Sequence, residues 1–208
     1  MTHYEQVAYS KGYGNVAGID EAGRGPLAGP VVAAACILPK GLLIPGVDDS
    51  KKLSPRRRRE LYLYLIEHPD IQYGVGIVSE KEIDRINILE ATKIAMLETV
   101  KNLKTVPDYL LVDGLKLIHP EIPSEKIIKG DQLSLSIAAA SIIAKETRDE
   151  LMKELHAAYP VYGFDKHAGY GTAFHRKAIE MHGPCDAHRM TFEPVKSKFT
   201  IAELAEGH

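Results

Sequence analysis

Five short segments carry the apolar or alternating pattern of β-strands, each bounded by Gly, Pro or charged residues. Runs of four to eight residues rich in Val, Ile, Leu and Ala are typical of strands buried in a sheet. The pattern predicts strands over residues 16–20, 31–38, 72–78, 109–112 and 126–129. The first two are separated by a loop of about ten residues, in which five of the eight residues 23–30 are Gly or Pro.

Helical periodicity and capping signals fill most of the remaining chain. Ser54 followed by Pro55 is a good helix start, and Ser79 with Glu82 forms a capping box. We expect helices over residues 55–67, from 80 onward, over 88–103, from 134 to 159 and from 172 to 183. Residues 1–15 are expected to form a lead-in, and the tail after 184 an irregular segment with one more turn near 200–205.

This order of elements predicts the fold class. The first two strands are joined by a loop and suit antiparallel pairing, whereas the later strands are separated by helices and suit parallel pairing. The result is an α/β protein with a mixed sheet and helices on both faces.

Composition limits the classes of function. The chain has 208 residues, 45% of them hydrophobic, which predicts one domain, or one domain with an appendage, around a sizeable core. Its formal net charge of −2 excludes a generally basic nucleic-acid coat but allows a local basic patch. Cys36 and Cys185 form no disulfide framework. Without an apolar signal segment or a run long enough to cross a membrane, we expect a cytoplasmic protein.

Acidic residues recur where predicted strands end. Asp20, Asp113 and Asp131 each follow an apolar strand, and Glu21 adds a fourth acid. If the three strands are neighbours, these carboxylates meet at one edge of the sheet and require cations. Such an oxygen-rich set suits Mg²⁺ or Mn²⁺ better than Zn²⁺. Because side chains alternate along a strand, Asp20 and Glu21 serve one site only if the strand has already turned. The alternative is that these are ordinary turn and N-cap acids, and spacing alone leaves both interpretations open.

Two basic stretches flank the start of the first helix. Ser50, Lys51 and Lys52 lie on a loop and are well placed to contact phosphates. The four arginines 56–59 in the first helical turn oppose the helix dipole, so they need compensation from Glu60, solvent or a bound phosphate. For them we favour a solvated face.

The residues His182, Cys185 and His188, with His175 nearby, superficially resemble a zinc site. They lack the paired Cys-x-x-Cys of structural zinc sites, so we do not assign one.

Residues 18–25, Gly-Ile-Asp-Glu-Ala-Gly-Arg-Gly, resemble the signature of the type 2 ribonuclease H family, ribonuclease HII. Further matching blocks follow in the right order and bring the resemblance to roughly residues 16–195. They are residues 49–54, 112–114, 129–131, 138–149, 162–172, 182–184 and 188–194.

The resemblance implies an RNase H-like fold with a five-stranded sheet. It implies a single catalytic domain over residues 1–208, with a C-terminal helical extension from about 155. It also implies an endonuclease that hydrolyses the RNA strand of RNA–DNA hybrids and cuts 5′ of single ribonucleotides in duplex DNA. The reaction would use two Mg²⁺ or Mn²⁺ ions and leave 3′-hydroxyl and 5′-phosphate ends. We expect a monomer with no membrane partner, and a sliding clamp is a candidate protein partner.

Carried over by position, the family's metal-binding catalytic acids are Asp20, Glu21, Asp113 and Asp131. The loop that reads the ribose 2′-hydroxyl is Gly23, Arg24 and Gly25, and Tyr170 stacks at the sugar that follows the ribonucleotide. The phosphate contacts are Ser50, Lys51 and Lys52. A glycine-rich loop suits its role, because the 2′-hydroxyl is what separates RNA from DNA.

The chain departs from the family pattern at two places. Gly171 stands where the family often has proline, and we expect this glycine to loosen the tyrosine loop. Residues 185–187 replace the usual Ser-Pro-Ile, which puts the packing of the tail in question.

Two other functions are less favoured by the sequence. A hybrid-binding module without turnover is disfavoured by the four intact acids. A DNA nuclease of the same fold is disfavoured by the Gly-Arg-Gly loop and Tyr170.

Overall fold

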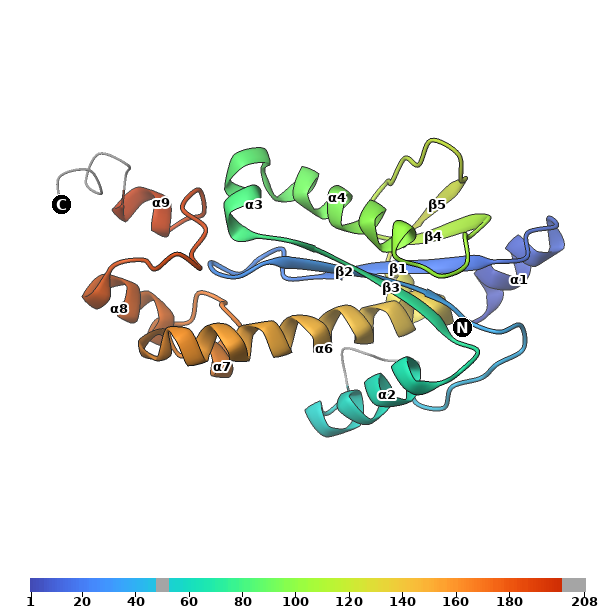
Figure 1. Cartoon of the computed structure of the whole chain (residues 1–208), viewed down its shortest axis with the longest axis horizontal. Helices are drawn as coiled ribbons and strands as arrows, with labels where there is room; N and C mark the ends of the chain where they lie inside the picture. Colours follow the sequence, from blue (N-terminus) through green and yellow to red (C-terminus); the bar gives the residue numbers. More distant parts are fainter. Residues whose placement is uncertain (48–52, 200–208) are drawn as a thin grey trace.

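The computed structural model of the protein describes residues 1–47 and 53–199, within which five strands form one mixed sheet with helices on both faces (Figure 1). The strands are β1 (Val16–Ala22), β2 (Val31–Ile37), β3 (Gln72–Val78), β4 (Tyr109–Asp113) and β5 (Ser124–Ile127). Their order across the sheet is β3-β2-β1-β4-β5. The β1–β2 and β2–β3 pairs are antiparallel, whereas β1–β4 and β4–β5 are parallel. The predicted α/β class and mixed sheet are confirmed.

The helices begin largely where the capping residues predict. Side-chain oxygens of Ser54, Ser79, Ser134 and Thr172 each accept a backbone N–H three residues later, at 3.2–3.3 Å. The helices are α1 (His3–Ser10), α2 (Pro55–Glu67), α3 (Glu80–Ile86), α4 (Ile88–Lys101), α5 (Gly130–Leu133), α6 (Leu135–Ala158), η1 (Pro160–Tyr162), α7 (Phe164–His167), α8 (Ala173–His182) and α9 (Val195–Lys198).

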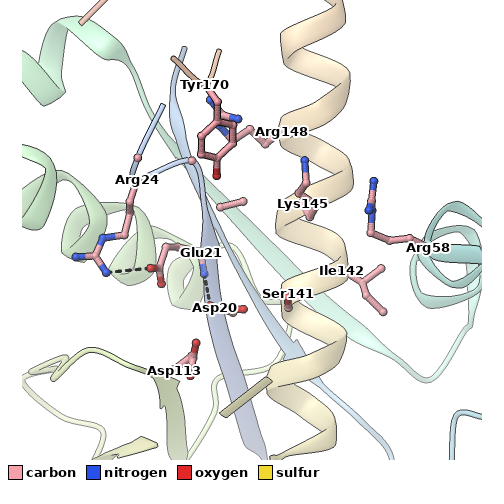
Figure 2. Close-up of a pocket in the computed structure, with 13 residues that line it drawn as sticks. Asp20, Glu21, Arg24, Arg58, Asp113, Ser141, Ile142, Lys145, Arg148 and Tyr170 are labelled. Carbon is pink, nitrogen blue, oxygen red and sulfur yellow. Dashed lines mark hydrogen bonds and ion pairs between the residues drawn. The ribbon is translucent and has the colours of Figure 1, made fainter. Parts of the chain in front are cut away.

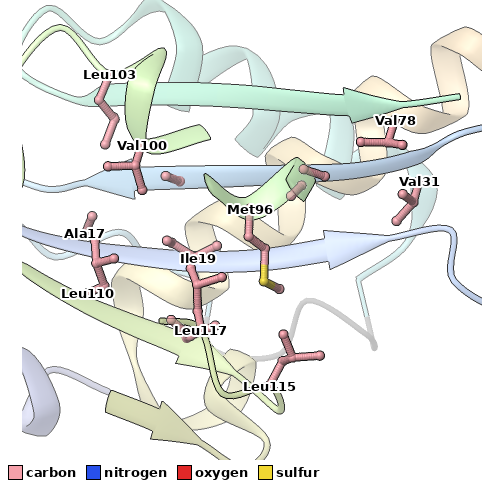
Figure 3. Close-up of a cluster of buried hydrophobic side chains, with 14 of the residues drawn as sticks. Ala17, Ile19, Val31, Val78, Met96, Val100, Leu103, Leu110, Leu115 and Leu117 are labelled. Carbon is pink, nitrogen blue, oxygen red and sulfur yellow. The ribbon is translucent and has the colours of Figure 1, made fainter. Parts of the chain in front are cut away.

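The sheet separates two hydrophobic cores. On one face, α3 and α4 pack over Ala17 and Ile19 of β1, with Met96 at the centre (Figure 3). On the other face lie α2 and α6, whose small residues Ala138–Ala140 pack on β2 (Figure 1). Side chains of β1 therefore alternate between α4 and α6, and this alternation places Asp20 on the α6 side.

Helix α6 lies unusually close to β1 because of Gly18. A Cβ atom at this position would lie 2.2 Å from the backbone nitrogen of Ile137. Any side chain there would push the first turns of α6 away from the strand. The close contact fixes the position of α6 relative to the end of β1, where Ser141 faces Asp20 (Figure 2).

The structure corrects the sequence prediction at the N-terminal end of the chain. The expected lead-in contains α1, which has no side-chain N-cap. It is instead held by the buried carboxylate of Glu5, which accepts hydrogen bonds from Ser134 Oγ and from the backbone nitrogen and Oγ of Ser136 at 2.6–2.9 Å. Such long-range contacts leave no local signal. The turn predicted near 200–205 lies outside the described residues.

None of the helices in residues 1–47 and 53–199 is long and apolar enough to cross a membrane.

Candidate active site

The last three residues of β1 have a free edge. Strand β4 pairs with β1 only from Val16 to Ile19, whereas β2 continues alongside it as far as Ala22. A cleft of about 480 Å³ opens beside this edge (Figure 2). The described residues that line it are Asp20, Glu21, Ala22, Gly23, Arg24, Gly25, Arg58, Asp113, Ser141, Ile142, Lys145, Arg148 and Tyr170.

Three of the four predicted acids line this cleft. Asp20 is buried and lies toward α6, Glu21 lies toward Arg24, and Asp113 lies at the end of β4 (Figure 2). The expectation that β1 must turn before both acids can share a site is wrong, because the strand continues to Ala22. Since β4 ends at Asp113, side chains from opposite faces of β1 reach the same opening around its free edge.

Burial and mutual proximity disfavour the charged forms of the acids in this cleft. Burial raises the pKa of Asp20 well above its usual value, and the charges of Glu21 and Asp113 raise it further. Burial also raises the pKa of Glu21, as does Asp113, while Arg24 acts in the opposite direction through an ion pair of 3.2 Å. The charged forms of Asp20 and Glu21 are therefore disfavoured, and a cation bound between the two carboxylates would stabilise these charged forms.

Asp131 has a different position from the one predicted. Strand β5 ends at Ile127, and Lys129 then adopts a left-handed conformation that starts the short helix α5. Asp131 is buried on this helix and does not line the cleft among the described residues. It lies next to Gly130, whose backbone N–H donates to Asp113 Oδ1 at 2.6 Å. The fourth acid is therefore buried on α5, directly after the residue that contacts Asp113.

The donor set fits a hard divalent cation by its chemistry. Asp20, Glu21 and Asp113 offer only carboxylate oxygens to the cleft, as Mg²⁺ and Mn²⁺ prefer. Within residues 1–47 and 53–199, however, no three Asp, Glu, His or Cys side chains already form a ligand cluster. Glu21 pairs with Arg24, and Asp20 Oδ1 accepts the backbone N–H of Glu21 at 2.8 Å. If Glu21 bound a metal ion, the ion would replace at least the ion pair between Glu21 and Arg24.

The loop beside the acids is held from inside by Arg189. This fully buried side chain donates to the carbonyls of Gly23 at 2.6 Å, Pro26 at 2.9 Å, Arg24 at 3.0 Å and Gly29 at 2.8–2.9 Å. Burial lowers the pKa of Arg189 to about 9, so the guanidinium remains charged at neutral pH. One side chain thus satisfies most of the loop's inward-facing carbonyls.

A second buried arginine completes the support. Arg148 on α6 donates to the carbonyls of Pro30, Ala28 and Ala168 at 2.9–3.1 Å. Its Nε would lie 2.0 Å from a Cβ atom on Gly23, a residue with φ of +95°. Glycine is required there for both reasons. The sequence marks these arginines only as positive charges, because their carbonyl partners lie far away in the chain.

Tyr170 borders the same cleft from the C-terminal side. Its side chain is 49% exposed, and a Cβ atom on Gly25 would lie 3.7 Å from its Cε1 atom. The Tyr170 carbonyl accepts hydrogen bonds from the Thr172 backbone N–H at 2.8 Å and from the His175 ring at 2.9 Å. These bonds join the residues on either side of Gly171, which stands where the family often has proline.

The basic stretches divide into two groups. Ser50, Lys51 and Lys52, the predicted phosphate contacts, lie outside the described residues. Arg58 borders the cleft and forms ion pairs with Glu146 and Asp149 of α6.

The other three arginines of this run also form ion pairs. Arg59 pairs with Glu150 of α6, and both Arg56 and Arg57 pair with Glu60. The expected compensation by Glu60 is therefore confirmed for these two arginines, while Arg58 and Arg59 contact α6 instead of forming a purely solvated face.

Comparisons with known proteins agree with this geometry. A family model described as Ribonuclease HII matches residues 17–195. The chain is 63% identical over 193 residues to ribonuclease HII of Chlamydia trachomatis serovar L2, covering 93% of this chain and 88% of that protein. The crystal structure of ribonuclease H2 from Pyrococcus horikoshii OT3 is similar with a TM-score of 0.75 at 29% identity, covering 88% of this chain and 96% of that one.

A second solved structure, the PCNA:RNase HII complex from Archaeoglobus fulgidus, is similar with a TM-score of 0.73 at 29% identity. The match covers 86% of this chain and 95% of that one. With the family model spanning nearly the whole described fold, the chain belongs to the ribonuclease HII family and is a ribonuclease H.

Proposed function

We propose that this ribonuclease H hydrolyses the RNA strand of RNA–DNA hybrids and also cuts 5′ of single ribonucleotides embedded in duplex DNA. The observation that carries the proposal is one cleft shared by three carboxylates, the Gly23–Gly25 loop and Tyr170. The carboxylates supply the place for hydrolysis. The loop and the tyrosine supply recognition of a ribose and of the sugar that follows it.

Asp20, Glu21, Asp113 and Asp131 would hold Mg²⁺ or Mn²⁺. Divalent ions bound there would activate water and stabilise the charge on the departing oxygen. In the reaction, the oxygen of water bonds to phosphorus and the P–O3′ bond breaks. The upstream strand then ends in a 3′-hydroxyl, and the ribonucleotide carries a 5′-phosphate.

Recognition is assigned to backbone and aromatic groups. The Gly23–Gly25 loop has little side-chain bulk, so its N–H and C=O groups can approach a ribose 2′-hydroxyl closely. Tyr170 presents a half-exposed ring beside Gly25, suited to stack on the next sugar. Ser50, Lys51 and Lys52 are proposed to contact backbone phosphates.

We extend the proposal to the assembly. Residues 1–208 would form a single catalytic domain, with the segment from about 155 to 208 as a helical extension. Leu27 of the loop shares a buried cluster with Phe164, Ile179 and Val195, which supports this assignment. We propose a cytoplasmic monomer, and the PCNA complex of the Archaeoglobus fulgidus relative supports a sliding clamp as a partner.

The test compares three labelled duplexes that carry one ribonucleotide, a continuous RNA strand or only DNA. We expect a cut 5′ of the ribonucleotide, cuts along the RNA strand and none in the DNA control. Cleavage of all-DNA duplex would favour a DNA nuclease. Tight binding without any cut, with either Mg²⁺ or Mn²⁺, would favour a hybrid-binding module.

A further inference from the structure

A pair of fully buried histidines lies behind the tyrosine loop, away from the carboxylates. His175 on α8 and His188 in the following segment are 0% and 2% exposed. Their Nε2 atoms lie 3.1 Å apart. Buried imidazoles in direct contact require a defined proton arrangement, because two protonated or two bare nitrogens would repel each other.

The contacts at both ends favour one arrangement, in which His188 Nδ1, 3.2 Å from both the Sγ and the carbonyl oxygen of Cys185, accepts a hydrogen bond. The backbone N–H of Cys185 donates to His188 Nδ1 at 2.9 Å, while the Cys185 carbonyl already accepts the N–H of His188 at 2.9 Å. His188 therefore carries its proton on Nε2 and donates to His175 Nε2. This leaves the proton of His175 on Nδ1, which lies 2.9 Å from the carbonyl of Tyr170. Both rings are neutral, each in a single tautomer.

The surroundings favour this neutral state. Burial lowers the pKa of both His175 and His188 to about 4; a charge on His167 lowers the pKa of His175 further, and a charge on His175 lowers the pKa of His188 further. The nearest other ring is His167, which stacks on His175 with centroids 4.6 Å apart. His167 Nε2 lies 2.8 Å from the carbonyl of Tyr162.

The histidine pair connects the two parts of the site that are proposed to recognise substrate. His188 pairs with Ala28 of the loop through a β-bridge, and its neighbour Arg189 holds the Gly23 carbonyl. At the other end, His175 holds the carbonyl of Tyr170. The connection from the loop to the tyrosine thus runs from the Gly23 carbonyl to Arg189, along the backbone to His188, and then through hydrogen bonds from His188 to His175 and from His175 to Tyr170.

We propose that His175 and His188 are positioning residues that fix Tyr170 relative to the Gly23–Gly25 loop. They thereby set the preference for a single embedded ribonucleotide over a continuous RNA strand. This inference rests on the proposed function, in which Tyr170 reads the sugar that follows the ribonucleotide. The histidines act through the tyrosine loop and do not touch the reacting atoms.

The experiment measures kcat/KM on a one-ribonucleotide duplex and on a continuous hybrid, and takes the ratio. His175→Phe keeps the ring bulk but removes both nitrogens, and we expect the ratio to fall about tenfold. His175→Asn keeps a donor near the Nδ1 position and should recover much of that loss. His182→Gln, at an exposed position of the same helix, is the matched control and should leave the ratio unchanged.

A double-mutant cycle separates positioning from general damage. If His175 acts through Tyr170, His175→Phe adds no further change to the ratio of Tyr170→Ala. An unchanged ratio in His175→Phe, or a loss fully additive to that of Tyr170→Ala, overturns the inference. Failure of the proposed function is distinct, because wild-type protein would then make no cut at the ribonucleotide.

A spectroscopic measurement on wild-type protein covers the case in which His175→Phe does not fold. Ring ¹⁵N shifts at pH 7 should show the Nδ1–H tautomer for His175 and the Nε2–H tautomer for His188. A charged ring, or the opposite tautomer at either position, overturns the inference whatever the kinetics show.

Discussion

Arg189 Nη2 donates a 2.6 Å hydrogen bond to the carbonyl of Gly23, 166 residues earlier in the chain, from a fully buried side chain. The bond ties the last part of the matched family region to the loop that follows β1. The geometry of that loop therefore depends on the C-terminal segment, which must pack before the loop is complete.

Replacement of Arg189 by lysine should weaken both the fold and the site. A lysine ammonium cannot reproduce the planar set of donors that reaches Gly23, Pro26 and Gly29, and some carbonyls would stay buried without partners. We expect a loss of about 2–4 kcal/mol in the free energy of unfolding, measured by urea denaturation. Arg176→Lys, on the exposed side of α8, should change it by less than about 0.5 kcal/mol. Equal losses in the two variants would contradict this account of the loop.

Alanine at Gly23 should be far more harmful than alanine at Gly12. Both glycines have nearly the same backbone angle, with φ of +95° and +96°. A Cβ atom at Gly23 meets Arg148 Nε at 2.0 Å, whereas one at Gly12 meets nothing within 4 Å. Gly12→Ala should cost only the left-handed backbone term of about 1–2 kcal/mol, and Gly23→Ala about 1–3 kcal/mol more. Urea denaturation measures the difference, and similar values for the two variants would show that Arg148 yields easily.

Asp20→Asn should stabilise the metal-free protein while removing activity. Burial and the like charges of Glu21 and Asp113 raise the pKa of Asp20, so the anion lowers the free energy of unfolding at neutral pH. Asparagine removes that repulsion. In chelator we expect a gain of roughly 0.5–2 kcal/mol, a rise of a few degrees in Tm. Asp70→Asn, an exposed control, should leave Tm unchanged. A lower Tm for Asp20→Asn would mean that the carboxylates are not in mutual repulsion.

The buried histidines predict the direction of acid destabilisation. The pKa of His175 and of His188 is about 4 in the fold, below the ordinary value of 6.5 expected when the chain is unfolded. Between these values the unfolded chain binds more protons, so the free energy of unfolding falls as pH drops from about 6.5 toward 4. The slope approaches about 1.4 kcal/mol per pH unit for each histidine. Urea denaturation from pH 7.5 to 4.5 should show a shallower slope in His175→Phe, and parallel slopes would disprove the assignment.

The sequence alone predicts the parts of this site that depend on local pattern. Asp20 and Asp113 lie at the ends of recognisable apolar strands, and Ser54 and Ser79 are recognisable caps. The end of the last strand is not predicted correctly, because β5 stops at Ile127 and the left-handed Lys129, which precedes α5, has no sequence signal. The shared opening for Asp20 and Glu21 depends on where β4 ends against β1, which is a property of the folded sheet.

The buried arginines and histidines that hold the loops beside the cleft are even harder to predict from the sequence. The structural role of Arg148 and Arg189 is not predicted, since nothing adjacent to them in sequence reveals that they are buried against loop carbonyls. His175 and His188 suggest a metal site by spacing, while the structure shows their nitrogens hydrogen-bonded to each other and to the backbone. Long-range packing decides the role of each.

The most direct test of the central claim is the single-turnover rate of cleavage at one ribonucleotide in duplex DNA. The account predicts that Asp20→Asn, Glu21→Gln and Asp113→Asn each lower this rate by about a thousandfold or more, that chelator abolishes it, and that Asp70→Asn leaves it unchanged. Near-normal cleavage by any of the three variants, or cleavage in chelator, would contradict the assignment of the active site to this cleft.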